Sequence, residues 1–362
     1  MSAVIPAAKP LIGDDEREAV DRVLRSGMIA QGPEVAAFES EFATQIVDGR
    51  ACVAVNSGTS GQHLGLLAAG VGPGHEVIVP SFTFAATANS VALTGATPVF
   101  ADIEPDYFCL DAAAVEAAIT ENTVGIMPVH LYGHPANMDA LGAVAAKHGL
   151  QIFEDAAQAH AAAWQGRPVG TFGSFAMFSL YPTKNMTSGE GGMVSCATDE
   201  IARMMRLLRN QGMEKRYENE VVGFNARMTD VHAAIGRVQL GKLAGWTKQR
   251  QDNAAFLDAN LTGVVVPPVA DGATHVYHQY TIRVAEDRDG FAQALLDEHG
   301  VGTGVYYPIP NHRLPSFQHE LDLPQTEKAA AEALSLPVHP SLGQGDLERI
   351  VAAVNALAAA GA

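Results

Sequence analysis

Cysteines are scarce in this 362-residue chain, and long apolar runs are absent. Its three cysteines, Cys52, Cys109 and Cys196, are odd in number and far apart, so they form neither a disulfide framework nor a zinc-binding spacing. A reducing, cytoplasmic compartment is the resulting expectation. No apolar stretch approaches the ~20 residues that span a bilayer, and the first residues lack the basic and apolar segments of a signal peptide. We therefore expect a cytoplasmic protein with no membrane partner.

Positive charge is also in short supply. The chain has 23 Lys and Arg against 40 Asp and Glu, for a formal net charge of −17. Nucleic-acid binding needs a basic face to meet phosphates, so we expect no nucleic-acid partner. Because 48% of the residues are hydrophobic and only 17% are charged, a disordered chain is excluded and a large buried core is expected. The length allows two domains.

Short apolar runs alternate with longer, Ala-rich segments through the first half of the chain. The runs span residues 52–55, 76–79, 98–101, 123–129 and 151–153, and the segments span 58–69, 83–93, 111–119 and 138–148. This order predicts parallel strands joined by crossover helices. Strands so short and apolar suit a sheet that helices cover on both faces.

The rest of the chain predicts more helices and a second unit. Helices are expected at 14–26, from about 198, and over about 229–261, with strands at 174–179 and 193–195. The final part predicts a strand at 279–284, a helix at 289–299, a strand at 302–307 and a helix at 345–358. We expect a large α/β domain over residues 1–262 and a smaller α+β domain over 263–362.

Three loops that follow predicted strands carry chemically useful side chains. The first, Asn56-Ser-Gly-Thr-Ser60, opens a helix. Gly58 permits close backbone approach, and Thr59 and Ser60 add hydroxyls to the N–H groups of the helix start, which is a phosphate-binding arrangement. An ordinary helix cap is the alternative.

The second loop begins with two carboxylates, Glu154 and Asp155, directly after an apolar strand. An acid at this place in a pocket binds a cation or a protonated ring nitrogen, although capping of the next turn is an alternative. Gln158 lies one turn further if the segment is helical, so that it would face the same ligand as Asp155. No cluster of side chains has metal-ligand spacing, and we expect no metal site.

The third loop carries Lys184, one of only seven lysines. It follows an apolar strand and precedes a glycine-rich run, whereas the other lysines lie in helical patterns, in a charged stretch or near the start of the chain. Desolvation at such a place lowers the pKa of a lysine and makes it a Schiff-base nucleophile. A surface lysine in a loop is the alternative.

The three loops together point to one cofactor. A hydroxyl-rich helix start suits a phosphate, an aspartate suits a pyridine nitrogen, and a lysine suits an aldehyde, and these are the three needs of pyridoxal phosphate (PLP). They occur in one predicted α/β domain, in the order phosphate loop, Asp155, Lys184. Parallel sheets bind ligands at the carboxyl ends of their strands, where all three loops are predicted.

The chain resembles the sugar aminotransferases of the DegT/DnrJ/EryC1/StrS family. The matching stretches, in the family's order and over nearly the whole chain, include NSGTSGQHLGLLAAGVGPGHEVIVPSFTFAATANSV, EDAAQAHAA, FSLYPTKNMTSGEGGMV, GFNARMTDVHAA and VGTGVYYPIP. The resemblance implies a fold-type-I PLP enzyme. Such an enzyme has a mostly parallel seven-stranded sheet between helices, a small C-terminal domain, and a homodimer with shared active sites.

The resemblance also implies residue roles. Lys184 corresponds to the Schiff-base lysine, and Asp155 to the partner that keeps the pyridine nitrogen protonated. The other implied cofactor contacts are Gln158 at the ring hydroxyl, Thr59, Ser60 and Ser179 at the phosphate, Phe84 on the ring face, and Asn225, which reaches the phosphate from the partner subunit. A buried core phenylalanine is the alternative for Phe84.

A further set of residues lies in segments that shape the sugar pocket in members of the family. The set is His130, Glu190, Arg227, Tyr306, Tyr307 and His312. Arg227 is a candidate for binding an anionic group of either substrate. His160 also matches a histidine of the family, but a lone histidine beside alanines is more often structural. Tyr306 stands where members often have His, which leaves the sugar specificity open.

The expected reaction is a ping-pong transfer of an amino group from L-glutamate to the keto carbon of a nucleotide-linked 4-keto-6-deoxysugar. Lys184 would move the proton, first as general base and then as acid. The TSGEGG run at 187–192 resembles the branch of the family that aminates C4. Three alternatives stay open: a C3 aminotransferase, a dehydratase of the family, whose members carry His at the lysine position, and a non-catalytic regulator that binds PLP or a nucleotide sugar.

Overall fold

The computed structural model describes residues 4–360 and is built around one seven-stranded sheet. Its strands are β1 (Ala51–Val55), β2 (Glu76–Pro80), β3 (Thr97–Ala101), β4 (Thr123–Ile126), β5 (Gln151–Asp155), β8 (Phe175–Ser179) and β9 (Gly192–Cys196). They lie in the order β1-β9-β8-β5-β4-β2-β3. All are mutually parallel except β9, which pairs antiparallel with both neighbours. The predicted mostly parallel seven-stranded sheet is confirmed.

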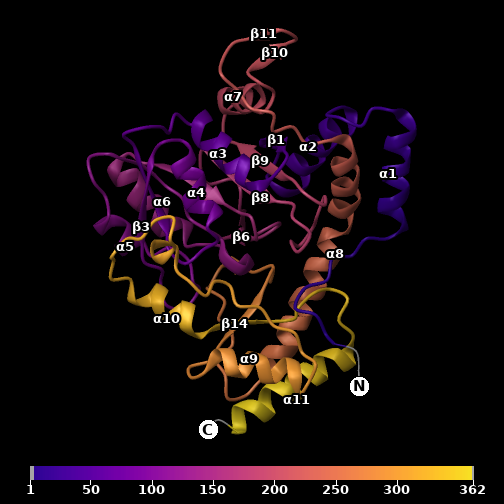
Figure 1. Cartoon of the computed structure of the whole chain (residues 1–362), viewed down its shortest axis with the longest axis vertical. Coiled ribbons are helices and arrows are strands. Elements are labelled where there is room, and N and C mark those ends of the chain that lie inside the picture. The colour runs from indigo at the N-terminus through magenta and orange to yellow at the C-terminus, as the bar shows by residue number, and fades with distance from the viewer. Residues whose placement is uncertain (1–3, 361–362) are drawn as a thin grey trace.

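Helices cover the sheet and extend beyond it (Figure 1). The helices are α1 (Asp14–Ser26), α2 (Pro33–Ile46), α3 (Gly58–Ala68), α4 (Ala86–Leu93), α5 (Ala112–Ala117), α6 (Met138–His148), α7 (Asp199–Arg209), α8 (Asp230–Asn260), α9 (Arg288–Asp297), α10 (Pro324–Glu332) and α11 (Gln344–Ala360). Those over 14–26 and 138–148 have the predicted bounds. The helix predicted from residue 83 begins three residues later, because residues 83–85 form the loop at its start.

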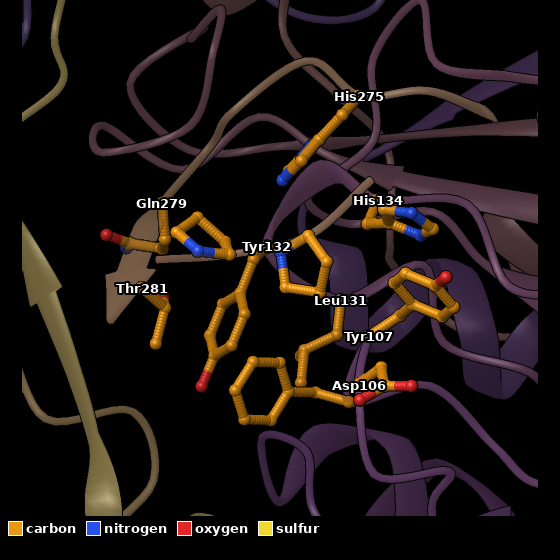
Figure 2. A pocket seen from close by; sticks show the side chains of 11 residues that line it. Asp106, Tyr107, Leu131, Tyr132, His134, His275, Gln279 and Thr281 are labelled. Atoms are coloured by element: carbon orange, nitrogen blue, oxygen red, sulfur yellow. The ribbon is translucent and has the colours of Figure 1, made fainter. Parts of the chain in front are cut away.

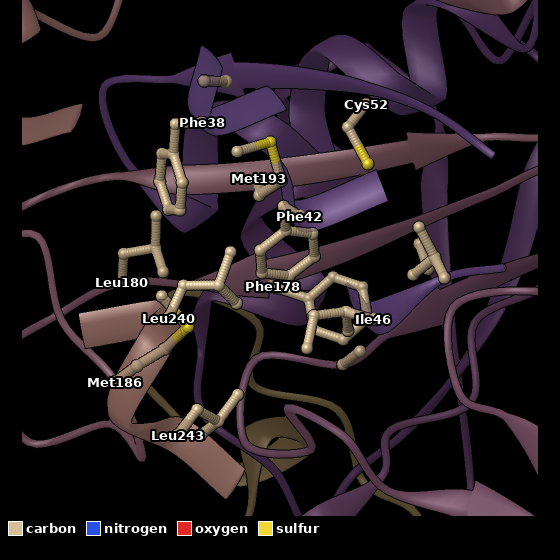
Figure 3. Packing of buried hydrophobic residues seen from close by; sticks show 14 of the residues in the cluster. Phe38, Phe42, Ile46, Cys52, Phe178, Leu180, Met186, Met193, Leu240 and Leu243 are labelled. Carbon is tan, nitrogen blue, oxygen red and sulfur yellow. The ribbon is translucent and has the colours of Figure 1, made fainter. Parts of the chain in front are cut away.

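Alternate residues of the central strands pack against helices on opposite faces. Figure 3 shows one face, where Phe178 of β8 and Met193 of β9 meet Phe38 and Phe42 of α2 and Leu240 of α8. The rings of Phe42 and Phe178 lie 5.2 Å apart at 65°, a favourable edge-to-face geometry. The intervening residues of the same strands pack against α3 and α7, as the two-residue period of a strand requires.

The C-terminal part contains a two-stranded antiparallel sheet of β13 (Tyr280–Arg283) and β14 (Ala333–Leu336). Helices α8, α9 and α11 and the early residue Ile5 pack around it in one apolar cluster. The strand predicted at 302–307 is wrong. That segment makes only single-residue bridges nearby, Val301 with Ile5 and Gly304 with Ser335, and its two glycines offer no side chains to pack against a neighbouring strand.

The sequence analysis missed several elements. These are α2, α10, β14 and five short strands: β6 (Ala163–Trp164), β7 (Arg167–Pro168), β10 (Met213–Lys215), β11 (Glu218–Asn219) and β12 (Ala273–Thr274). Strands of two or three residues carry no visible period and depend on their partners. In Figure 1 the β10–β11 hairpin projects at one end of the molecule, while α11 lies at the other and α8 runs between them. Within residues 4–360, no helix is both long and apolar enough to cross a membrane.

Candidate active site

A cavity of about 710 Å³ lies at the carboxyl ends of the central strands. Residues from five predicted segments line it: Thr59 of α3, Phe84 before α4, Asp155 and Gln158 at the end of β5, Ser179, Lys184 and Glu190 around the loop after β8, and Tyr306 and Tyr307 from the C-terminal part. The first and last of these nine residues, Thr59 and Tyr307, are 248 positions apart in the sequence (307 − 59), and the fold brings them together. The position matches the rule that open α/β sheets bind ligands outside the carboxyl ends of their strands.

One end of the cavity is the N-terminus of α3. The hydroxyl of the cap residue Ser57 accepts a hydrogen bond from the Ser60 amide (3.1 Å) and donates one to the Ser60 hydroxyl (2.9 Å), so the Ser60 side chain is turned to the cap and does not line the cavity. Gly58 packs so closely that an added Cβ would lie 3.0 Å from Met177 Sδ and 3.2 Å from Ser179 Cβ. The hydroxyls of Thr59 and Ser179 line the cavity here, and the positive end of the helix dipole favours an anion.

Asp155, the last residue of β5, lies deeper in the cavity and is 4% exposed. Its Oδ2 accepts a hydrogen bond from Thr87 Oγ1 at 2.8 Å, and its Oδ1 accepts one from the Ala157 amide at 3.1 Å. Both contacts fix the direction of the carboxylate. Thr87 was not predicted, and its place in the PSFTFAAT stretch is the one sequence signal for it.

Lys184 lies in the turn that follows β8 and is half-buried. Burial lowers the pKa of Lys184 from 10.5 to about 8, while the nearby Asp155 carboxylate opposes this shift. Within residues 4–360, no acceptor is hydrogen-bonded to its Nζ atom. The loop is held by Thr187, whose hydroxyl donates to the Leu180 carbonyl oxygen (2.9 Å), and by Asn185, whose Nδ2 donates to the Val276 carbonyl oxygen (3.0 Å). The loop that carries the amine is thus held in place, and the amine has a raised neutral fraction, as a nucleophile requires.

Gln158 links the segment after β5 to Tyr307 of the C-terminal part, which forms another part of the cavity wall. The segment after β5 is a turn and not a helix, so the helical spacing considered for Gln158 is wrong, although it does line the cavity with Asp155. Its Oε1 accepts a hydrogen bond from the Tyr132 amide at 2.6 Å, and its Nε2 donates to Tyr307 Oη at 3.1 Å. The Tyr307 ring lies 5.9 Å from that of Phe84.

Phe84 is 59% exposed, so the alternative of a buried core phenylalanine is wrong. Its ring lines the mouth of the cavity. An exposed aromatic ring at this place is available to stack on a bound ring system. The exposed aromatic Tyr181, which lines the same cavity, was not predicted.

Glu154 lies on the other face of β5, away from the cavity. Its Oε1 accepts hydrogen bonds from the Phe172 and Gly173 amides (2.7 and 2.9 Å), and its Oε2 accepts one from the Gly170 amide (2.7 Å). Its Oε2 also lies 3.3 Å from His130 Nε2. Burial alone would raise the pKa of Glu154, but these hydrogen bonds outweigh it and hold the pKa below its usual value. We call these five residues the Glu154 cluster.

Four other predicted site residues also lie outside the cavity of this chain. His312 is fully buried between Ser81 Oγ (2.6 Å) and Glu327 Oε1 (3.1 Å). Arg227 donates to Asn210 Oδ1 at 2.9 Å, and Asn225 is exposed beside it. His160 is fully buried, with its ring centre 5.5 Å from that of Phe178 and tilted by 55°, and its pKa is lowered to about 3 by burial and by nearby Lys184.

Several lining residues had no local signal in the sequence. They include Gln62 of α3, Thr83, Thr183, and His278 and Gln279 just before β13. His278 is 94 positions from Lys184 (278 − 184), yet Lys184 and burial together lower the pKa of His278 well below its usual value. Only the packing of the C-terminal part against the sheet brings His278 to the site.

A second pocket lies nearby and is far smaller. Figure 2 shows its wall of aromatic rings and histidines. The rings of Tyr107 and His134 stack 4.7 Å apart, and His275 meets His134 edge to face at 5.4 Å. Its volume is about 10 Å³, enough for one water. This pocket is therefore too small for a cofactor or a sugar.

The side chains of the larger cavity fit PLP. A glycine-lined helix N-terminus stands at one end, a buried acid at the other, and a lysine of lowered pKa between the walls. The carboxamide of Gln62 is buried in the wall without any partner among the described residues, as expected of a site that is completed by a polar ligand. Among residues 4–360, no group of three or more His, Cys, Asp or Glu side chains is placed to hold a metal ion.

Comparisons with known proteins define the class of the protein. The DegT/DnrJ/EryC1/StrS aminotransferase family matches residues 10–355. A "pleiotropic regulatory protein" of Geobacillus stearothermophilus is 45% identical over 344 residues, which are 92% of this chain and 91% of the relative. The dTDP-3-amino-3,4,6-trideoxy-α-D-glucose transaminase of Streptomyces venezuelae is 43% identical over 344 residues, 93% of this chain and 90% of the relative.

A solved structure agrees with these relatives. S. venezuelae DesV in complex with a ketimine intermediate superposes with a TM-score of 0.92 at 40% identity, over 98% of this chain and 99% of that one. The fold and the site thus define a PLP-dependent aminotransferase. The chain belongs to the DegT/DnrJ/EryC1/StrS aminotransferase family, and its substrates are nucleotide sugars.

Proposed function

We propose that the enzyme transfers an amino group from L-glutamate to C4 of a nucleotide-linked 4-keto-6-deoxysugar. The observation that carries the proposal is one cavity that holds Lys184, with its pKa lowered to about 8, together with the hydrogen-bonded carboxylate of Asp155. Bound PLP supplies an electron sink that stabilises the carbanion formed when an amino acid loses its α-proton.

The chain's own residues divide the work. Lys184 Nζ removes and returns the proton of the reacting carbon, which suits an amine whose pKa lies near neutral pH. Asp155 keeps the ring nitrogen protonated and Gln158 orients the ring hydroxyl. Thr59 and Ser179 hold the phosphate end with their hydroxyls, and Ser60 supports this end by accepting the hydrogen bond of the cap residue Ser57.

The remaining predicted residues serve the cofactor, the substrates or the packing around the site. Phe84 closes one face of the ring, and Glu190, Tyr306 and Tyr307 contact the sugar. Asn225 contacts the phosphate in the partner subunit, and Arg227 contacts an anionic group. His130 and His312 act through packing, because their ring nitrogens already have partners inside the chain.

The choice of C4 is supported by the TSGEGG run at 187–192, which forms the loop between Lys184 and β9. C3 is the second candidate, because the printed name of the S. venezuelae relative places the amino group at C3. The two differ in which carbon faces Lys184 and not in the chemistry. The name of the Geobacillus relative favours a regulator, and the same turnover assay tests this alternative.

The test begins with the visible spectrum of the purified holoenzyme before and after L-glutamate. Conversion of bound PLP to pyridoxamine phosphate is expected, and an unchanged spectrum would exclude glutamate as donor. The second half-reaction then uses TDP-, UDP- and GDP-linked 4-keto-6-deoxyglucose and the matching 3-keto sugars. NMR of the product locates the new amino group, and an amino group at C3 would overturn the choice of C4.

We also propose a homodimer with shared active sites. Apolar side chains are exposed in and beside the β10–β11 hairpin: Tyr217 is 79% exposed, Val222 92% and Phe224 41%. They lie next to Asn225, the residue proposed to reach the partner's cofactor. Light scattering after size-exclusion chromatography tests the assembly, and a monomer at micromolar concentration would overturn it.

The domain division and the location in the cell are proposals as well. The apolar cluster around β13, β14 and α11 supports a separate C-terminal unit, and the proposed boundary between residues 262 and 263 lies just after α8, whose end packs into the same cluster. Limited proteolysis tests it by seeking a cut near that position. A cytoplasmic location is supported by three buried, unpaired cysteines, and fractionation of the source cells tests it.

A further inference from the structure

A buried glutamine in the wall of the active-site cavity has no hydrogen-bond partner among the residues that the structure describes. Gln62 is 0% exposed, yet its Nε2 and Oε1 meet no acceptor or donor within residues 4–360. Buried carboxamides are nearly always paired, because an unpaired one keeps the full penalty of leaving water. Since Gln62 lines the cavity that holds PLP, a polar group of the ligand is the expected partner.

The position of Gln62 on α3 indicates which end of the ligand it meets. Gly58 and Thr59 form the first turn of the helix, and Gln62 follows one turn later on the same face. Helical side chains tilt toward the N-terminus of their helix, so the carboxamide is directed at that first turn. This turn, with Ser179 beside it, is the anion-binding end of the cavity.

The rest of α3 shows that an amide is not needed for packing. The other large buried side chains of the helix are Leu64 and Leu66, both in the apolar cluster between α3 and the sheet. A leucine at position 62 would fill the space of the glutamine without an unpaired polar group. The amide therefore lowers the stability of the ligand-free chain. It gains a hydrogen-bond partner only when the ligand is bound.

We propose that Gln62 is a further ligand of the PLP phosphate and that its Nε2 donates a hydrogen bond to a phosphate oxygen. A phosphate group has strong acceptor oxygens, and a carboxamide nitrogen carries two N–H donors. Asp155 and Lys184 serve the ring and the reacting carbon, so Gln62 exchanges no proton with either substrate. It is a positioning residue that fixes the phosphate and, through it, the ring.

The test uses Gln62→Leu apoenzyme in a buffer free of phosphate and sulfate. The dissociation constants of PLP and of pyridoxal, which has the same ring and aldehyde but no phosphate, are measured by absorbance. PLP binding is expected to weaken about tenfold, equivalent to about 1.4 kcal/mol, while pyridoxal binding stays within about twofold. The Tm of the apoenzyme is expected to stay level or rise. Gln62→Met, an unbranched replacement, repeats the measurement if the leucine variant does not fold.

Asn253 provides a matched control. It is also a buried amide, 3% exposed, but its Nδ2 donates to the carbonyl oxygens of Val338 (3.3 Å) and His339 (3.2 Å), outside the cavity. Asn253→Leu is expected to lower the Tm of the apoenzyme and leave the PLP dissociation constant unchanged. The opposite pattern in the two variants separates a ligand contact from a structural one.

Gln62→Glu sharpens the test, because a carboxylate of the same shape repels the phosphate. PLP binding is expected to weaken more than in Gln62→Leu, again with little change for pyridoxal. Unchanged PLP binding in Gln62→Leu, or an equal loss for PLP and pyridoxal, would overturn the proposal. So would a Tm of the Gln62→Leu apoenzyme that falls as in Asn253→Leu.

Discussion

Asp155 and Glu154 are consecutive residues of β5, and both are almost fully buried, at 4% and 1% exposed. They lie on opposite faces of the strand. Asp155 faces the cavity and is held by two hydrogen bonds from Thr87 and Ala157, which leave acceptor positions free for a ligand. Glu154 accepts three backbone N–H groups and contacts His130, so its oxygens are occupied within the chain.

The comparison shows that residue type and burial alone do not identify a functional acid. What distinguishes the two carboxylates is whether their hydrogen-bonding capacity is used inside the chain. The Glu154 cluster stabilises the loop over residues 170–173, and Asp155 serves the bound cofactor. Variants on the two sides of β5 should therefore separate loss of turnover from loss of stability.

The largest effect is expected on the cavity side from Lys184→Ala. Without the amine no group removes the proton of the reacting carbon, so turnover with L-glutamate should fall below detection. The circular dichroism spectrum and Tm of the apoenzyme should match the wild type, because Lys184 Nζ has no hydrogen-bond partner in the described chain. Turnover retained in this variant would contradict its assigned role.

Asp155→Asn is expected to lower kcat by at least about 100-fold, in the range of a lost acid–base partner. The amide keeps the shape and the hydrogen bond from Thr87, but it removes the charge that protonates the ring nitrogen. Stopped-flow spectra of the glutamate half-reaction measure this loss of rate. If Glu154→Gln lowered kcat as much, the contrast between the two sides of β5 would be refuted.

The pH dependence of PLP binding should reflect the lowered pKa of Lys184. Only the neutral amine attacks the aldehyde, so the rate of PLP incorporation into the apoenzyme should rise through a midpoint near pH 8. From pH 6 to pH 8 the neutral fraction grows about 50-fold. Because Asp155 raises the pKa of Lys184, Asp155→Asn should move the midpoint to lower pH. A midpoint near 10.5 would show that the amine is not desolvated.

Glu154→Gln should act on stability. The glutamine keeps one accepting oxygen, but its NH2 group takes the place of the other. The backbone N–H of Gly170, or those of Phe172 and Gly173, then lose their acceptor, and the free energy of unfolding should fall by about 1–3 kcal/mol. Since the folded pKa of Glu154 is lowered, its stabilisation is present above its usual pKa and is lost as pH falls through the folded value. Urea unfolding at pH 7 and below pH 4 measures both effects. The difference between variant and wild type should shrink at the lower pH.

The smallest effect is expected from Tyr307→Phe. The variant loses the 3.1 Å hydrogen bond from Gln158 but keeps the ring beside Phe84. A single such bond has a net contribution of about 0.5–1.5 kcal/mol, so kcat/KM should fall about two- to tenfold. Steady-state kinetics with the sugar substrate measure the change. A loss as large as that of Asp155→Asn would place Tyr307 in the proton chemistry instead.

Much of the fold followed from local patterns. The bounds of α1 and α6 agree with the sequence prediction, because an acidic first turn or an Asn cap starts each helix and a left-handed glycine ends it. The strand at 302–307 was wrong, since a strand needs a neighbour that only the fold supplies. The strand β14, which the sequence analysis missed, exists because it pairs with β13 more than 50 residues earlier.

In the candidate site, too, some features followed from the sequence and others only from the tertiary structure. The sequence by itself determined a phosphate-binding helix start, an acid at the end of a strand and one unusual lysine, because each is a short motif whose chemistry depends on adjacent residues. Only the tertiary structure decided that Glu154 faces away from Asp155, that Gln158 holds Tyr307, and that Gln62 is buried without a hydrogen-bond partner in the described part of the chain. Burial and hydrogen-bond pairing depend on residues distant in the chain, and these contacts form only when the sheet and its covering helices have packed.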